Sequence, residues 1–351
     1  MDFGVYLHIP FCSHRCDYCA FATWTDRPHL MGEYLDAVRT DIVRAVDDGM
    51  PPATSVFVGG GTPTLVPADG LATVLRAIPL APGAEVTVEC NPDDVTRELI
   101  ATYAGAGVNR VSIGVQSMVP HVLASLGRTH DPANVERAVA AVRAVGLPTF
   151  NVDIIYGAAG ETLDDWRTTL ERTLALEPPH VSAYALTVEA GTPLADDPAR
   201  HPDDDVQADE YELADDLLTA AGLANYEVSN WARPGHECRH NLLYWRQDDY
   251  RGFGCAAHSH RDGRRWWNLR TPERYIAAVH DDRSTEAAGE TLEPDVRHIE
   301  GLQLSLRTRA GVPLDALDGD ELPGVVEREG DRWVLTRRGR LMANDVAVRL
   351  R

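Results

Sequence analysis

The chain alternates between short apolar runs and longer segments whose apolar residues recur at helical spacing. Six of the short runs are rich in β-branched residues and predict buried parallel strands: residues 5–9, 55–58, 85–88, 110–115, 149–155 and 181–186. Helical faces are clearest in two of the intervening segments: Leu35, Val38, Ile42 and Val46 in one, and Val135, Val139, Val142 and Val145 in the other. The order predicts an α/β fold of parallel βαβ units.

Six such units are too few to close an eight-stranded barrel, so we predict a partial (β/α)6 TIM-like barrel with its site at the carboxyl ends of the strands. The repeat ends after residue 186, and a polar stretch at 192–205 follows it. We expect the partial barrel to occupy residues 1–230, a linking region 231–295, and a small α+β accessory domain 296–351. In that domain a turn at 329–331 leads into one arm of a short hairpin, 332–335.

Composition narrows the class of protein. The 351 residues include 33 Lys plus Arg against 54 Asp plus Glu, a formal charge of −21, which argues against broad affinity for nucleic acid. Hydrophobic residues at 44% supply a packed core, and no run approaches the roughly 20 apolar residues of a membrane span. The start lacks the pattern of a signal peptide, so we expect a cytoplasmic protein. The short basic cluster Arg337, Arg338 and Arg340 indicates a solvated surface.

The densest chemical signal is a group of three cysteines directly after the first predicted strand: Cys12, Cys16 and Cys19. In a chain without a secretory signal, such crowding indicates a metal site rather than disulfides. A structural zinc site takes four ligands, and no fourth Cys or His follows at a usual spacing. Three thiolates on a 4Fe-4S cluster would leave one iron open to an external ligand. His14 is expected to face solvent, and Cys90, Cys238 and Cys255 to be ordinary thiols.

Further polar positions follow the strands. The triplet Gly59-Gly60-Gly61, followed by Thr62, comes after the second strand, where missing side chains let backbone groups approach a polar ligand. Glu89 and Gln116 end the third and fourth strands, and Asp153 lies inside the fifth. A buried carboxylate needs hydrogen-bond donors or a cation. These residues are candidates for the wall of a pocket.

The cysteine spacing, on a loop after the first strand of a partial barrel, resembles the radical S-adenosylmethionine superfamily. Segments 6–12, 59–64, 112–117 and 153–157 resemble its HemN-like branch, which includes the coproporphyrinogen III dehydrogenases and a group of heme chaperones. The resemblance implies that the three cysteines hold a 4Fe-4S cluster whose open iron binds S-adenosylmethionine. It also implies that eight residues contact this cofactor: Tyr6, Gly60, Gly61, Thr62, Glu89, Gln116, Arg128 and Asp153.

Two departures from the dehydrogenases favour the heme chaperones. Phe21 stands where the dehydrogenases carry a fourth cysteine, and their longer N-terminal extension does not precede the cluster motif. The alternative is an oxygen-independent coproporphyrinogen III dehydrogenase, in which an adenosyl radical abstracts hydrogen from a porphyrinogen propionate. A zinc-stabilised nucleic-acid binder is a weaker third hypothesis.

Residues 240–245, His-Asn-Leu-Leu-Tyr-Trp, resemble the HNxxYW motif of the heme chaperones, so the region 231–295 is expected to bind heme. A neutral imidazole can ligate heme iron axially, which makes His240 the first candidate ligand. Asn241 is expected to orient that ring by a hydrogen bond. Tyr244 and Trp245 offer flat apolar surface to the macrocycle.

A second histidine-rich segment, residues 252–260, resembles the GxGxxAHS stretch of the same group and makes His258 and His260 secondary candidates. The partners implied by the resemblance are heme, recipient apo-hemoproteins, a heme donor such as bacterioferritin, and a second copy of the chain in a homodimer.

Overall fold

The computed structural model describes residues 2–351 and is built around one mixed sheet. The strands follow the order β12-β11-β10-β9-β1-β2-β3-β4-β5-β6-β8-β7. All six predicted strands are present and pair in parallel: β1 (Phe3–Ile9), β2 (Ala53–Gly60), β3 (Leu80–Cys90), β4 (Arg110–Gln116), β5 (Thr149–Tyr156) and β6 (His180–Ala185). The predicted α/β partial barrel is therefore the framework of the molecule.

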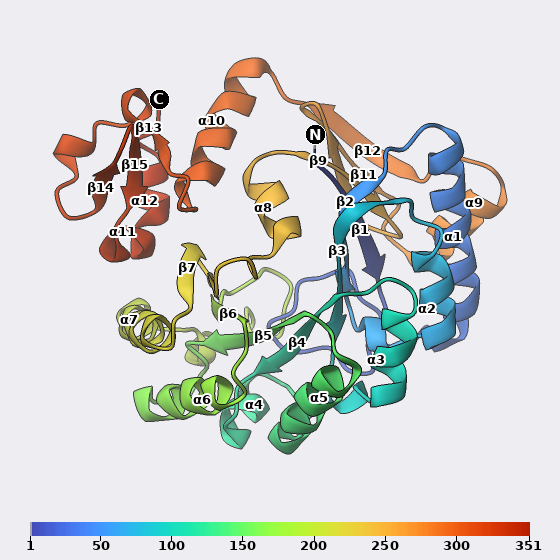
Figure 1. The fold of residues 1–351 in the computed structure, drawn as a ribbon, viewed down its shortest axis with the longest axis horizontal. Helices are drawn as coiled ribbons and strands as arrows, with labels where there is room; N and C mark the ends of the chain where they lie inside the picture. The colour runs from blue at the N-terminus through green and yellow to red at the C-terminus, as the bar shows by residue number, and fades with distance from the viewer. Residues whose placement is uncertain (1) are drawn as a thin grey trace.

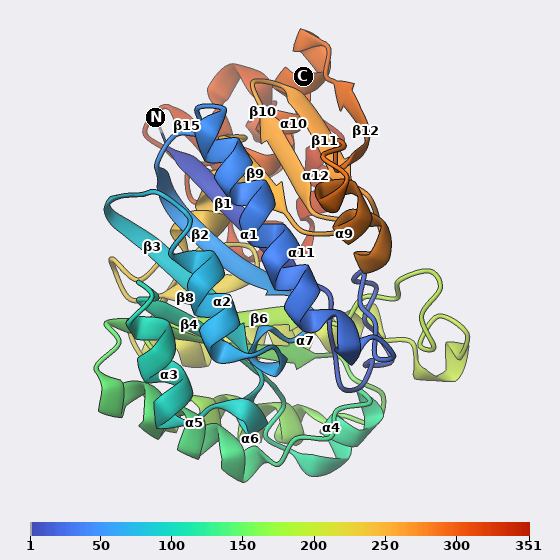
Figure 2. The ribbon, with the colours of Figure 1, turned by 90° about the vertical axis from the view of Figure 1, so that its right-hand side faces the viewer.

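Helices cover the outer face of this sheet (Figures 1 and 2). They are α1 (Met31–Asp47), α2 (Ala68–Leu75), α3 (Arg97–Ala104), α4 (Pro120–Ser125), α5 (Pro132–Val145), α6 (Leu163–Ala175) and α7 (Asp204–Ala220). The two helices marked by apolar spacing, α1 and α5, are confirmed. None of the helices within residues 2–351 is long and apolar enough to cross a membrane.

The sheet is wider than the six predicted strands. The expected linking region contributes β9 (Asp249–Phe253), β10 (His258–Arg261), β11 (Arg264–Asn268) and β12 (Glu286–Thr291), together with α8 (Arg239–Trp245) and α9 (Pro272–His280). Strand β9 pairs in parallel with β1 and starts this extension. At the other end β6 pairs with β8 (Asn230–Ala232), which pairs with β7 (Ala224–Glu227). The strands of the extension were missed because β9, β10 and β11 are short and rich in Arg, His and Trp, and β12 lacks β-branched apolar residues.

Strand β1 shows how the sheet separates its two faces. Val5, Leu7 and Ile9 are fully buried in the main hydrophobic core. Tyr6 and His8 alternate with them and line a cavity on the inner face instead. Because side chains along a strand point alternately to opposite faces, the outer face of β1 packs against helices while the inner face is free for polar groups.

The last segment forms a unit with its own hydrophobic core (Figure 1). Its elements are α10 (Pro294–Leu306), β13 (Val312–Pro313), β14 (Val326–Glu329), β15 (Arg332–Leu335), α11 (Arg337–Leu341) and α12 (Ala343–Ala347). The predicted hairpin is present as the antiparallel pair β14 and β15.

Two arginines of this unit are not a free basic surface. Arg337 and Arg340 form ion pairs, both 2.7 Å long, with Asp216 and Asp215 of α7. The expectation of a solvated basic cluster is therefore wrong for these two side chains and fits only the exposed Arg338. Their acidic partners lie more than 100 residues earlier in the chain, so the local sequence could not reveal them.

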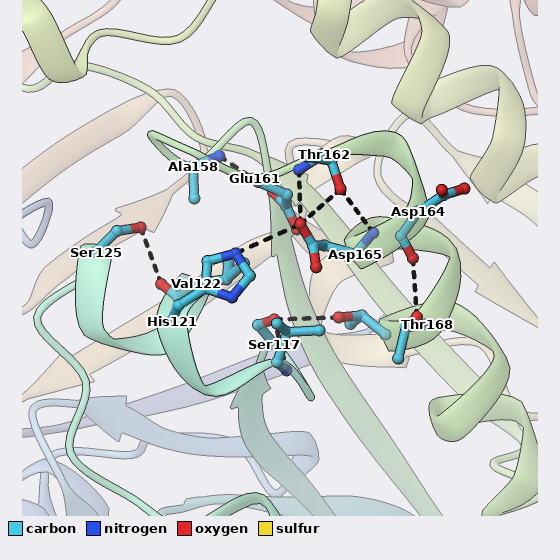
Figure 3. A network of polar contacts seen from close by, with 12 residues as sticks. Ser117, His121, Val122, Ser125, Ala158, Glu161, Thr162, Asp164, Asp165 and Thr168 are labelled. Carbon is cyan, nitrogen blue, oxygen red and sulfur yellow. Dashed lines mark hydrogen bonds and ion pairs between the residues drawn. The ribbon is translucent and has the colours of Figure 1, made fainter.

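The turn from β5 into α6 is fixed by a polar network (Figure 3). The Thr162 hydroxyl accepts a hydrogen bond from the Asp165 N–H at 3.2 Å, and the Asp165 carboxylate accepts one from the Thr162 N–H at 3.0 Å. This capping box satisfies backbone donors at the start of the helix. The Glu161 carboxylate accepts from the N–H groups of Gly157 and Ala158, both at 3.1 Å. The carboxyl end of β5 is thereby held in place.

Candidate functional site

The three clustered cysteines lie on the loop that follows β1. The loop is closed by backbone hydrogen bonds from Cys12 to Trp24, at 3.1 Å, and from Trp24 to Pro10, at 2.7 Å. Cys12, Cys16 and Cys19 are each partly exposed and line one cavity of about 720 Å³. We call it the cluster cavity. It lies at the carboxyl ends of the parallel strands, as predicted for this fold.

The glycine triplet supports this loop. The N–H of Gly61 donates to the carbonyl of Ile9 at 2.7 Å, and that of Thr62 to the carbonyl of Phe11 at 2.8 Å. A Cβ atom at Gly61 would lie 2.6 Å from the Phe11 oxygen. At Gly60, φ is +108°, a backbone conformation that favours glycine. The sequence indicated amides held ready for a ligand, but two of these amides instead position the cysteine loop.

The surroundings of two of the thiols keep them protonated until a metal displaces the proton. Burial raises the pKa of Cys12 and of Cys19 above the ordinary thiol value. The Arg128 guanidinium lies 3.7 Å from the Cys16 sulfur and donates to the Gly114 carbonyl at 3.0 Å. Iron binding displaces the thiol proton, and a nearby cation stabilises the negative charge that remains.

The donor set fits an iron–sulfur cluster in its chemistry, since thiolates are the usual ligands of such clusters. Within residues 2–351, no group of three or more His, Cys, Asp or Glu side chains, these thiols included, is arranged to hold a single metal ion.

Two carboxylates face the interior of the cluster cavity. Burial and the neighbouring charge of Asp153 raise the pKa of Glu89 to about 8, although Glu89 accepts a hydrogen bond from the Gly60 N–H at 3.2 Å. Asp153 accepts hydrogen bonds from Ser112 at 2.6 Å and from Asn151 at 2.8 Å. Burial nevertheless raises its pKa. The donors that a buried Asp153 requires are therefore present.

Gln116, at the end of β4, has a left-handed backbone conformation with φ +62°, which is uncommon for a residue other than glycine. The pairing of β4 with β5 shifts register at the same point, between Gly114 and Gln116. Strained backbone of this kind persists where the surrounding structure fixes it, often at functional sites.

Seven of the eight predicted cofactor contacts line the cluster cavity: Gly60, Gly61, Thr62, Glu89, Gln116, Arg128 and Asp153. Tyr6 does not. Its hydroxyl lies 3.1 Å from Nδ1 of His8, and its side chain lines a second cavity. His14 is exposed at the rim of the cluster cavity. The other three cysteines, Cys90, Cys238 and Cys255, are buried and free.

The helix α8 carries the HNxxYW segment on the inner side of the sheet (Figure 1). His240 is fully buried, with Nδ1 2.9 Å from the Ser55 hydroxyl and Nε2 2.8 Å from the Tyr244 hydroxyl. Its ring stacks on Phe57 at 5.5 Å, and burial lowers its pKa to about 3. The ring is neutral, as an iron ligand must be, but it borders neither cavity and both of its nitrogens are engaged.

The other residues of the motif divide between the two cavities. Asn241 was expected to orient His240, but Ser55 and Tyr244 take that role, and Asn241 lines the cluster cavity. Tyr244 lines the second cavity. Trp245 lines neither.

The second cavity has a volume of about 840 Å³ and was not predicted. We call it the aromatic cavity, because Tyr6, Tyr244, Tyr250 and Trp267 contribute to its wall. The rings of Tyr244 and Tyr250 meet edge to face at 4.6 Å. Phe21 borders both cavities and is 65% exposed.

The model of the radical SAM superfamily matches residues 6–173. Over 98% of its length, the chain is 43% identical to a protein of Mycobacterium tuberculosis named heme chaperone HemW, of which 93% is covered. The chain belongs to the HemW family. A HemW of Escherichia coli is 36% identical, over 98% of this chain and 96% of that protein.

A solved structure shows the same fold as this HemW-family chain. It is the coproporphyrinogen III oxidase HemN from Escherichia coli, described as a radical SAM enzyme, with a TM-score of 0.86 and 21% identity. The match covers 99% of this chain and 89% of that one. It confirms the predicted HemN-like fold.

Proposed function

We propose that this HemW-family chain is a heme chaperone, which binds heme and delivers it to recipient hemoproteins. The relatives from Mycobacterium tuberculosis and Escherichia coli carry that name. One observation carries the proposal: α8 connects two adjoining cavities, with Asn241 on the cluster cavity and Tyr244 on the aromatic cavity. The motif that resembles those of heme chaperones thus lies between a thiol-lined site and a cavity lined by aromatic rings.

The cluster cavity supports a 4Fe-4S cluster and S-adenosylmethionine as the resident cofactors. Cys12, Cys16 and Cys19 would hold the cluster, and when bound with S-adenosylmethionine it supplies one-electron chemistry. Glu89 and Asp153 line the cavity, and each attracts a sulfonium cation when its carboxylate is ionised. Arg128 stabilises negative charge at Cys16.

The test is an anaerobic titration of the cluster-reconstituted protein with hemin, followed by mixing with an apo-cytochrome b acceptor. A heme chaperone gives saturable binding with one heme per chain, and the heme spectrum then changes to that of the acceptor. Binding that never saturates, or heme that stays on the chain, would contradict the proposal.

The dehydrogenase alternative is tested with the same preparation. The likeness to HemN shows the fold alone, and Phe21 occupies the position at which the dehydrogenases carry a fourth cysteine. We expect no conversion of coproporphyrinogen III to protoporphyrinogen IX under reducing conditions with S-adenosylmethionine. Turnover of the porphyrinogen would establish the enzyme in place of the chaperone.

A further inference from the structure

Three histidines line the aromatic cavity, and two of them are fully engaged. The ring nitrogens of His8 lie 3.1 Å from the Tyr6 hydroxyl and 2.9 Å from a backbone carbonyl. Those of His260 lie 3.2 Å from a backbone carbonyl and 3.2 Å from a backbone N–H. Within residues 2–351, the His258 ring has no hydrogen-bond partner. It is the one imidazole of the cavity that is free to bind iron.

The strand register presents this ring to the cavity. His258 on β10 is paired with Trp267 on β11, and the two rings stack at 5.6 Å with 29° between their planes. The next pair on the same face is His260 with Arg265. His258 is exposed, whereas Ser259, which points to the opposite face, is fully buried. Trp267 therefore limits the orientations of an accessible imidazole.

The same cavity carries two uncompensated cations. Arg270 and Arg274 both line it and are exposed. The ion pairs and side-chain hydrogen bonds among residues 2–351 include neither guanidinium. Arg265, in contrast, is paired with Glu290 at 2.8 Å and with Glu300 at 3.1 Å. In a chain with a net charge of −21, two unpaired guanidinium groups beside one free imidazole indicate an anionic ligand.

Heme has three features that complement this wall: a flat apolar ring for the aromatic side chains, an iron for the imidazole, and two carboxylates for the guanidinium groups. Resting on the proposed chaperone function, we propose that heme binds in the aromatic cavity, with His258 as the axial ligand and Arg270 and Arg274 on the propionates. Arginine pairs with carboxylates through two parallel hydrogen bonds. The volume of about 840 Å³ lies within the range of small-molecule sites.

The cluster cavity is a poorer place for heme. Its lining includes Cys12, Cys16 and Cys19, so the proposed 4Fe-4S cluster and S-adenosylmethionine would occupy it. Within this proposal His240 is a positioning residue: its Nε2 lies 2.8 Å from the Tyr244 hydroxyl and holds that ring at the aromatic cavity. The HNxxYW segment then contributes to heme binding through Tyr244.

The ligand is tested with His258→Ala, and the matched control is His280→Ala, which removes an exposed imidazole of α9 outside both cavities. Hemin and metal-free protoporphyrin IX are the two probes. We expect His258→Ala to weaken hemin binding by about tenfold or more, to change the heme electron paramagnetic resonance spectrum, and to leave protoporphyrin IX binding within about twofold. Added imidazole should restore the parent spectrum.

The propionate contacts are tested with Arg270→Gln combined with Arg274→Gln, against Arg39→Gln on the exposed face of α1. Because both probes carry propionates, we expect the double variant to weaken hemin and protoporphyrin IX alike, by about tenfold. An effect on hemin alone would contradict the assignment of these arginines.

Different results would contradict the proposed chaperone function and the proposed heme site. If the parent chain does not bind hemin saturably, the proposed function is wrong. If the parent binds hemin and His258→Ala retains both its affinity and its spectrum, the chaperone stands and the His258 site is overturned. A spectrum that changes only in a folded His240→Ala variant would likewise overturn it and assign the iron to His240.

Discussion

The two cavities share the Ala20-Phe21 segment as a border, yet their polar groups differ in how they are bound. In the cluster cavity the two buried carboxylates have partners: Asp153 is bound by Ser112 and Asn151, and Glu89 by a backbone N–H. In the aromatic cavity a free imidazole stands beside unpaired guanidinium groups. These exposed groups are hydrated in the free chain, and an anionic ligand can replace that water.

The difference also follows the two parts of the sheet. The cluster cavity lies at the ends of parallel strands, where neighbouring strand ends bring polar residues together. The aromatic cavity lies on the extension formed by β9, β10 and β11, whose antiparallel register sets side chains directly opposite each other. One sheet thus carries both cavities, one at the ends of its parallel strands and one on its extension.

Removal of a cluster thiol is expected to have the largest effect and to separate the two cavities. Cys16→Ala should abolish iron and sulfide binding, because three thiolates are the whole cysteine set of the loop. Hemin affinity should stay within about twofold, since no cysteine lines the aromatic cavity. Iron and sulfide analysis and a hemin titration check this, with Cys255→Ala as the control, a buried thiol that lines neither cavity. Loss of both activities in folded Cys16→Ala would show one coupled site.

The next largest effect is expected from a substitution in the glycine triplet, residues 59–61. Gly60→Ala places a Cβ atom against the His8 ring at φ +108°, so we expect a loss of about 2 to 4 kcal/mol of stability and a lower iron content. Gly49→Ala is the matched control, because its φ is +89° but nothing lies within 4 Å of the added atom. Urea denaturation measures both variants. Equal losses in the two would show that backbone strain alone matters at Gly60.

The charge of the cluster cavity is tested by pH. Only the ionised carboxylate of Glu89 attracts a cation, and a pKa of about 8 leaves about 9% ionised at pH 7 and about 91% at pH 9. The affinity for S-adenosylmethionine should therefore rise about tenfold as the pH rises from 7 to 9.

Equilibrium dialysis of the reconstituted protein measures this rise. Glu89→Gln should bind S-adenosylmethionine with little pH dependence, whereas Glu98→Gln, an exposed residue of α3, should behave as the parent. A rise with pH that persists in Glu89→Gln would place its origin in another group.

The sequence predicted the parts of the molecule that local pattern determines. Buried parallel strands are continuous apolar runs, so all six were found, and cysteine spacing located the cluster loop. The partners of isolated polar residues could not be found in this way. His240 is bound by Ser55, which is 185 residues away, and this contact buries the ring that the motif alone presents as a heme ligand.

The smallest expected effect is a loss of folding stability at the start of α6. Thr162→Ala removes the hydroxyl that accepts from the Asp165 N–H in the capping box of α6, so we expect a loss of about 1 kcal/mol (Figure 3). Thr168→Ala is the control: its hydroxyl bonds to the Asp164 carbonyl, one turn back in the same helix, and alanine is the better helix former. Thermal unfolding compares the two. If Thr162→Ala also lowered hemin affinity, the turn after β5 would be coupled to the aromatic cavity, and the separation of the two halves of the sheet would not hold.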